Sequence, residues 1–180
     1  MNYAANEDKW DIDNKAPLYN DVLGRPVFSS EGSEPLSLED AKAWGKIDQD
    51  VDDDIISSLI TAARRICENY SGIGFITRTI VVNINNSNGG FKLPYGPVTN
   101  IPTAVDFIGD TIELTYNMGQ IQWPFGNMTV TYNAGYSSLP ADLLTALKAQ
   151  VLFLYENRGE GATGISPVAK MILEPLREVV

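Results

Sequence analysis

The sequence predicts an α+β fold, in which a small bundle of two long helices and a short N-terminal helix carries a β-rich antiparallel insertion and an extended C-terminal tail. Two observations predict it. Apolar residues recur every three or four positions over about 53–71 and 140–157, the spacing of one buried helix face. Between them, over 76–134, short runs of β-branched and aromatic residues are separated by turn-forming Gly, Pro, Asn and Asp.

Length and composition indicate one main domain with two extensions. A chain of 180 residues, 44% of them apolar, can bury one core. Residues 1–35 are rich in acids, Asn, Ser and Gly, include three prolines and show no sustained period, so we expect an extended or disordered arm. The main domain then covers 36–158, and a hinged tail covers 159–180.

Capping signals set the first two helix boundaries. Ser37 precedes a short helix over about 38–44, and Gly45 ends it. The helix over 53–71 begins with acids, which suit the positive end of the helix dipole. Its apolar stripe consists of Ile55, Ile56, Leu59, Ile60, Ala63, Ile66, Cys67 and Tyr70. Burial of one stripe does not offset the entropy lost on ordering a lone helix, so we expect it to pack against the third helix, over about 140–157.

Four to six short antiparallel strands are expected between 76 and 134. The runs are TRTIVVNI, TAVDFIG, TIELTY, QIQWP and MTVTYNAG. Asn-Gly-Gly and Gly-Asp between runs suit hairpin turns because Gly and Asn tolerate positive φ.

The stretch VTYNAGYSSLPADLLTAL predicts a strand, a Gly-Tyr turn and a helix entered through a proline. Aromatic side chains at such a place bury a large area while their hydroxyls find partners. We therefore predict a rigid structural corner. Its residues are Tyr132, Gly135, Tyr136, Pro140 and Tyr155.

The tail over 159–180 is apolar, yet it is hinged by the glycines of GEGATGIS. Pro175 prevents it from forming one long helix. Val168, Met171, Ile172 and Leu173 need an apolar partner. Docking into another subunit would supply one.

The residue types argue against catalysis. The chain has no histidine, which excludes His-based triads, His general bases and His-containing metal sites. DQDVDDD resembles the start of a calcium loop, but Asp53 stands where that loop needs Gly and Leu59 where it needs Glu. The single cysteine, Cys67, fits a small buried residue in a reducing compartment. We expect no catalytic, metal or cofactor site.

Charge disfavours tight nucleic-acid binding. The net charge is −10, and residues 1–54 carry 14 acids against 5 bases. Such a surface does not gain from releasing DNA counterions.

No run of about 18 apolar residues predicts a membrane span, and the polar N-terminus does not match an export signal.

Several segments together resemble the head-to-tail connector (adaptor) proteins of tailed bacteriophages, a family also described as possible DNA-packaging proteins. In order, they are LSLEDAKAWGKID, DDDIISSLITAARRICENYSG, TRTI, LPYGPVTNI, VTYNAGYSSLPADLLTALKAQVLFLYENRG and AKMILEPLREV. They cover about 36–180, with the Tyr-x-Ala-Gly-Tyr turn into a helix ending Tyr-Glu-Asn-Arg as the most specific part. The acidic extension before Leu36 is longer than the usual start of the family.

The resemblance implies a virion protein of the neck, made in the host cytoplasm, that forms a ring, commonly dodecameric, beneath the portal. Such a ring extends the DNA channel and docks stopper or tail-completion proteins, so the implied partners are the chain itself, the portal, those proteins and passing double-stranded DNA without tight binding. The portal-docking tail would correspond to about 165–180. Its apolar residues are Ile165, Val168, Met171, Ile172, Leu173 and Leu176.

Acids that face the lumen of a ring would repel DNA phosphates and let the genome slide. Asp52, Asp53 and Asp54 are the candidate channel-lining acids. Two alternatives remain open: another neck or tail-completion subunit, and a DNA-binding packaging factor, which the acidic composition disfavours.

Overall fold

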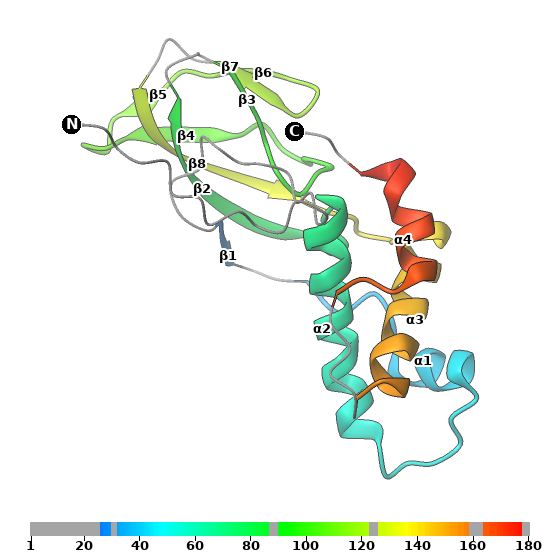
Figure 1. Ribbon diagram of the computed structural model, residues 1–180. Coiled ribbons are helices and arrows are strands. Elements are labelled where there is room, and N and C mark those ends of the chain that lie inside the picture. The colour runs from blue at the N-terminus through cyan, green and yellow to red at the C-terminus, as the bar shows by residue number, and fades with distance from the viewer. Residues whose placement is uncertain (1–25, 30–31, 87–89, 123–125, 159–163, 178–180) are drawn as a thin grey trace, which may run out of the picture.

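The computed structural model describes residues 26–29, 32–86, 90–122, 126–158 and 164–177 (Figure 1). The helices are α1 (Leu38–Gly45), α2 (Asp53–Ser71), α3 (Ala141–Glu156) and α4 (Pro167–Leu173), followed by a 3₁₀ turn at Glu174–Leu176. The strands are β1 (Val27–Ser29), β2 (Arg78–Asn86), β3 (Gly90–Lys92), β4 (Thr103–Asp106), β5 (Thr111–Ile112), β6 (Thr115–Asn117), β7 (Gln120–Gln122) and β8 (Gly126–Ala134). The predicted α+β fold is confirmed.

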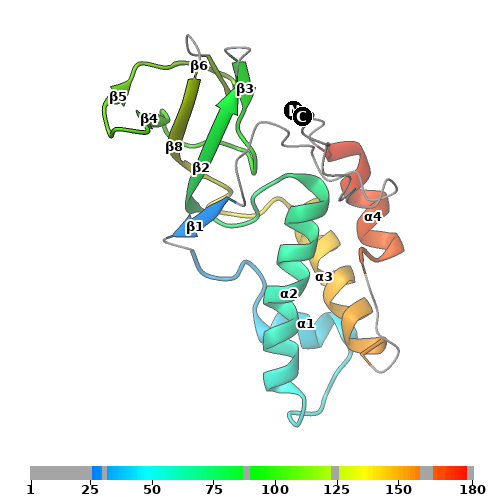
Figure 2. The same cartoon turned by 60° about the vertical axis from the view of Figure 1, so that its left-hand side comes forward.

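The helices form one end of the molecule and the sheets the other (Figures 1 and 2). The helices α2 and α3 lie side by side, as predicted, and α1 and α4 pack against them. Ser37 caps α1, because its Oγ accepts a hydrogen bond from the Asp40 N–H at 3.1 Å. The buried residues of this helical core include Ile56, Ile60, Ala63, Cys67, Phe75, Leu143, Leu147 and Leu173.

The β unit contains two antiparallel sheets with strand orders β1-β2-β8-β4-β5 and β3-β7-β6. The long strands β2 and β8 pair over all nine residues, from Arg78 opposite Ala134 to Asn86 opposite Gly126. Their inward-facing side chains close a second core with the smaller sheet. It includes Ile80, Val82, Ile84, Leu93, Ile121, Val130 and Tyr132.

The run TIELTY does not form one strand. It is divided into β5 in the larger sheet and β6 in the smaller one. The half-buried Leu114 between them packs against the β core, so the chain changes sheets without losing its apolar contact. A period of two continues through this change, which is why the sequence pattern does not reveal it.

The last part of the predicted arm belongs to the fold. The strand β1 pairs with β2, with Phe28 opposite Ile80. The Phe28 ring meets the Tyr95 ring edge-on, with centroids 5.3 Å apart. A strand of three residues is too short to show a period, so sequence analysis does not detect it.

Residues 164–177 of the predicted tail form a helix and a turn, not an extended segment. The Ser166 Oγ caps α4 by accepting from the Ala169 N–H, and Pro167 occupies the first turn. Gln150 on α3 holds this start: its Oε1 accepts from the Ser166 N–H at 2.7 Å, and its Nε2 donates to the Gly164 carbonyl at 3.1 Å. Pro175 lies in the 3₁₀ turn that ends α4, in line with its predicted role.

No helix among the described residues has the length and apolar character needed to cross a membrane.

Candidate functional site: an ionic joint and the surfaces it positions

The predicted corner is a close approach of two backbones. At Gly135, φ is +101°, and an added Cβ would lie 1.9 Å from the Ile76 carbonyl oxygen. The Gly135 N–H donates to the Pro97 carbonyl at 2.9 Å. This contact holds the segment that leaves α2 against the segment that enters α3. It therefore fixes how the helices are placed relative to the sheets.

The structure brings four of the five predicted corner residues to this region. The buried Tyr132 hydroxyl donates to the Pro94 carbonyl at 2.8 Å, Tyr136 packs on the helical core, and Pro140 immediately precedes α3. Tyr155 lies elsewhere. It is in the last turn of α3, about 20 Å along the helix from Pro140 at 1.5 Å per residue, and its hydroxyl donates to Asp52.

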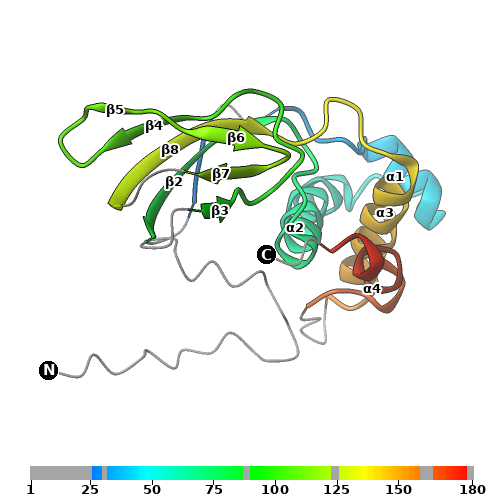
Figure 3. The same ribbon diagram turned by 90° about the horizontal axis from the view of Figure 1, so that it is seen from above.

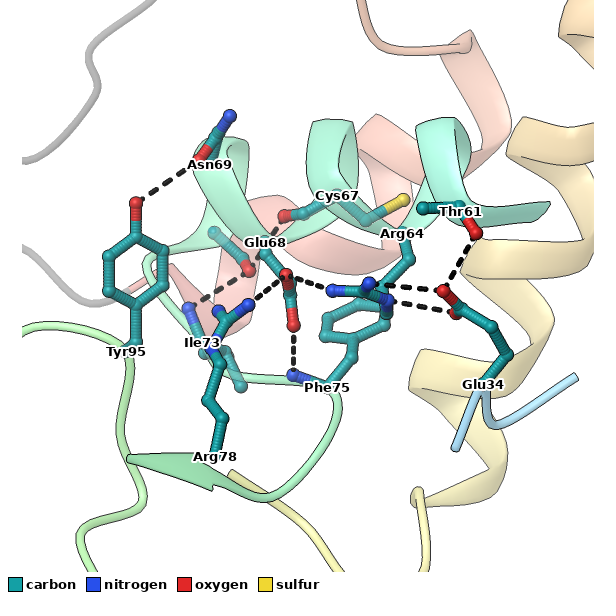
Figure 4. Close-up of polar contacts among 11 residues, drawn as sticks. Glu34, Thr61, Arg64, Cys67, Glu68, Asn69, Ile73, Phe75, Arg78 and Tyr95 are labelled. Atoms are coloured by element: carbon teal, nitrogen blue, oxygen red, sulfur yellow. Dashed lines mark hydrogen bonds and ion pairs between the residues drawn. The ribbon is translucent and has the colours of Figure 1, made fainter. Parts of the chain in front are cut away.

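A largely buried network of charges connects α2 with the segments that precede α1 and follow α2 (Figure 4). We call Glu34, Arg64, Glu68 and Arg78 the ionic joint. Arg64 donates to both oxygens of Glu34, at 2.8 and 3.0 Å, and to Glu68 Oε2 at 3.0 Å. Arg78 Nη1 lies 3.1 Å from the same Glu68 oxygen. The side chains of Arg64, Glu68 and Arg78 are at most 2% exposed.

The ionic joint connects three segments of the chain. Glu34 comes from the segment that enters α1, Arg64 and Glu68 from α2, and Arg78 from the start of β2. Glu68 Oε1 also accepts from the Phe75 N–H at 2.7 Å. Burial has the largest influence on Glu68 and raises its pKa, against the opposing effect of the two guanidinium groups.

Two aromatic rings cover the Arg78 end of the ionic joint. The Arg78 guanidinium carbon is 4.1 Å from the centre of the Phe28 ring and 5.1 Å from that of Tyr95. Sequence analysis missed this cluster, because its members are distant in the chain. The Arg64–Glu68 pair at the i, i+4 helix spacing was its single local signal.

The three predicted channel acids differ in their surroundings. Asp52 Oδ2 accepts from the Tyr155 hydroxyl at 2.7 Å and from Arg158 at 3.2 Å. Asp53 accepts from Lys42 Nζ at 2.7 Å. Asp54 is exposed. Asp52 and Asp53 therefore tie the start of α2 to α3 and α1, and Asp54 has the position best suited to an external role.

Asp52 gives a prediction for acid stability. The hydrogen bond from Tyr155, followed by Arg158, lowers the pKa of Asp52 below its ordinary value of 3.8. A depressed folded-state pKa contributes stability that is present above the ordinary pKa and is lost as pH falls below it. Thermal unfolding between pH 6 and pH 2.5 tests this role. Below about pH 4 the unfolding temperature of Asp52→Asn should fall less steeply with pH than that of the original chain. The Tyr155→Phe chain should behave similarly. If the unfolding temperature of both variants falls with pH as steeply as that of the original chain, Asp52 does not contribute to acid stability in this way.

The predicted docking residues of the tail fall into two groups. Val168, Met171 and Leu176 are 49%, 71% and 39% exposed, and Ile165 and Ile172 are half-buried. Leu173 is fully buried in the helical core of its own chain. While α4 stays on α3, a partner can therefore reach Met171 and its exposed neighbours but not Leu173.

Other apolar side chains are exposed far from α4. Phe107 and Ile108 on the turn between β4 and β5 are 88% and 69% exposed, and Met118 between β6 and β7 is 93% exposed. The exposed apolar residues of α4 and of the β4–β5 turn are typical of surfaces by which a structural protein assembles with others.

A sequence model described as HCP, head completion protein, matches residues 34–166. The chain belongs to this family and is thus a structural protein of phage head completion. The resemblance to phage head-to-tail connector proteins is confirmed at the level of the family. No match is found among curated protein sequences.

Three solved structures share the fold. A chain from the neck of an empty gene transfer agent (GTA) particle, computed with C6 symmetry, is 19% identical with a TM-score of 0.68, over 87% of this chain and 97% of that one. A chain from the virion of the native GTA particle is 19% identical with a TM-score of 0.67, over 87% and 97%. A chain from the neck of the native particle, computed with C12 symmetry, is 20% identical with a TM-score of 0.60, over 86% and 96%.

Proposed function

We propose that this protein forms a ring in the neck of a tailed phage, between the portal and the tail-side proteins, and extends the DNA channel. The observation that carries the proposal is the family match over residues 34–166. The shared fold with chains of GTA necks that were computed with C12 and C6 symmetry supports a ring, and twelve copies is the number we propose. Closed rings arise when one surface of a subunit binds a different surface of the next.

Within this proposal, the exposed side of α4 docks to the portal. Val168 and Met171 are exposed on a helix that is itself fixed by Ser166, Gln150 and the buried Leu173. A fixed helix loses little conformational entropy when a partner covers it. Asp54 is the acid that we place toward the channel, since its neighbours Asp52 and Asp53 already have partners in the bundle.

Substitution of the α4 surface tests the docking. Met171→Ser combined with Val168→Ser should weaken binding to isolated portal by at least about 30-fold, the scale of losing central apolar anchors. Because both side chains are exposed, the unfolding temperature should stay within about 2 °C of the original. Removing the whole tail is a poorer test, since it would also take Leu173 out of the core.

Met118→Ser is the matched control, since it removes a Met that is even more exposed than Met171, from the β unit. It should leave portal binding unchanged. Portal binding that survives loss of Met171 and Val168, or that Met118→Ser weakens equally, would show that α4 is not the docking surface. A reconstruction of the ring on the portal would also show whether Asp54 faces the channel.

A further inference from the structure

The turn between β4 and β5 carries the most prominent pair of adjacent exposed apolar side chains in the described part of the chain. We call Phe107 and Ile108 the hairpin knob; they are 88% and 69% exposed. Behind them, Ala104 is buried and Ile112 packs against the β core, so the hairpin is anchored to the larger sheet. Exposed apolar side chains that lie together on an anchored turn favour an interaction site.

Hydrogen bonds hold the backbone of the turn that carries the hairpin knob. Asp106 Oδ1 accepts from the N–H groups of Ile108 and Asp110, both at 2.9 Å. The Asp106 N–H donates to the Asp110 carbonyl at 2.9 Å, and the Gly109 N–H donates to the Asp106 carbonyl at 3.2 Å. A partner would therefore meet preformed anchors and would not have to order a loose loop.

The charge around the hairpin knob restricts what can bind. Between Thr103 and Asn117 the charged residues are Asp106, Asp110 and Glu113, all acidic. The matching surface is an apolar pocket with Lys or Arg at its rim.

A cavity on this chain does not match that description. A cavity of about 360 Å³ in the described part lies beside the corner, and Glu34, Ser33 and Ser137 are among its lining residues. None of its lining residues is Lys or Arg. It thus offers no basic rim to the acids of the hairpin, so this cavity is not the place where a second copy would receive the hairpin knob.

The position of the hairpin indicates the side on which this partner lies. In all three ribbon views the β4–β5 hairpin is the part of the β unit farthest from α4 (Figures 1, 2 and 3). If α4 faces the portal, as the proposed function states, the hairpin faces the tail. We propose that the hairpin knob inserts into an apolar, basic-rimmed pocket of the protein that follows this ring on the tail side. This inference rests on the proposed function.

A photo-crosslinking residue at position 107 identifies what the knob contacts. Particles are assembled with this chain, irradiated, and the adducts identified by mass spectrometry, with the same residue at position 118 as the control. The expected adduct at 107 joins this chain to a tail-side neck protein. An adduct to a second copy, to the portal or to DNA, or no adduct in particles that contain the chain, would overturn the inference. If the original chain itself does not enter particles, the proposed function fails instead.

Substitutions give an independent test with isolated tails as the probe. Heads completed with Phe107→Ser, Ile108→Ser protein should carry the ring normally but join tails at least about 30-fold less efficiently. Heads completed with Met118→Ser protein should join tails normally. Asp110→Asn removes a rim charge and should slow tail joining at low salt and reduce its salt dependence. Normal joining by the double variant, or unchanged salt dependence with Asp110→Asn, would contradict the assignment.

Discussion

Gly135→Ala is expected to destabilise the fold strongly. The new Cβ would lie 1.9 Å from the Ile76 carbonyl oxygen and 2.6 Å from its carbon, which are backbone atoms that cannot rotate away. The positive φ of 101° adds strain for any L residue. We expect a loss of at least about 4 kcal/mol, a large part of the stability of a single domain. Urea unfolding followed by circular dichroism measures it.

Gly109→Ala is the matched control for the backbone conformation. Its φ is +94°, but an added Cβ meets nothing within 4 Å. This variant should lose about 1 to 2 kcal/mol, the cost of the left-handed conformation alone. If both variants lose the same amount, the contact with Ile76 is not what makes glycine necessary at the corner.

Arg64→Met should have the second large effect. It removes the cation shared by Glu34 and Glu68 and leaves buried Glu68 with one guanidinium partner. Breaking a buried ion pair from one side costs about 3 to 5 kcal/mol. Arg65→Met is the control, because Arg65 is the adjacent residue on α2 but is exposed. This variant should change the free energy of unfolding by no more than about 0.5 kcal/mol.

The dependence on pH distinguishes a lost charge partner from lost packing. Burial already raises the pKa of Glu68 in the folded chain, and removing Arg64 should raise it further. A raised folded-state pKa of an acid means that stability falls as pH rises from the ordinary value of 4.5 toward the folded one. The loss of unfolding free energy caused by Arg64→Met, relative to the original chain, should therefore be smaller at pH 5 than at pH 7.5. If this loss of unfolding free energy is the same at both pH values, the effect comes from lost packing and not from the lost charge partner.

The long periodic elements could be predicted from the sequence. The helices α2 and α3 each run for at least 16 residues with one apolar face, and β2 and β8 each have nine residues. Over such lengths the buried positions repeat often enough to identify the element. The turn at the corner could be predicted for a different, local reason. Glycine followed by Tyr and then Pro specifies a turn and a helix start.

The features that depend on long-range contacts could not be predicted. The ionic joint brings Glu34 to Arg64 and Glu68 to Arg78, and no local spacing encodes those pairs. Tyr155 was assigned to the corner from its residue type, but its place at the far end of α3 gives it Asp52 as a partner. Leu173 was assigned to a docking surface from its apolar character, but it is buried in the helical core of its own chain.

Electron microscopy of particles produced without this chain tests the central claim most directly. If the protein completes the head as a neck ring, such particles should be heads that carry a portal but lack tails, and adding the purified protein should restore tails and a ring of twelve copies beneath the portal. Tailed particles with a complete neck in the absence of the chain would contradict the account.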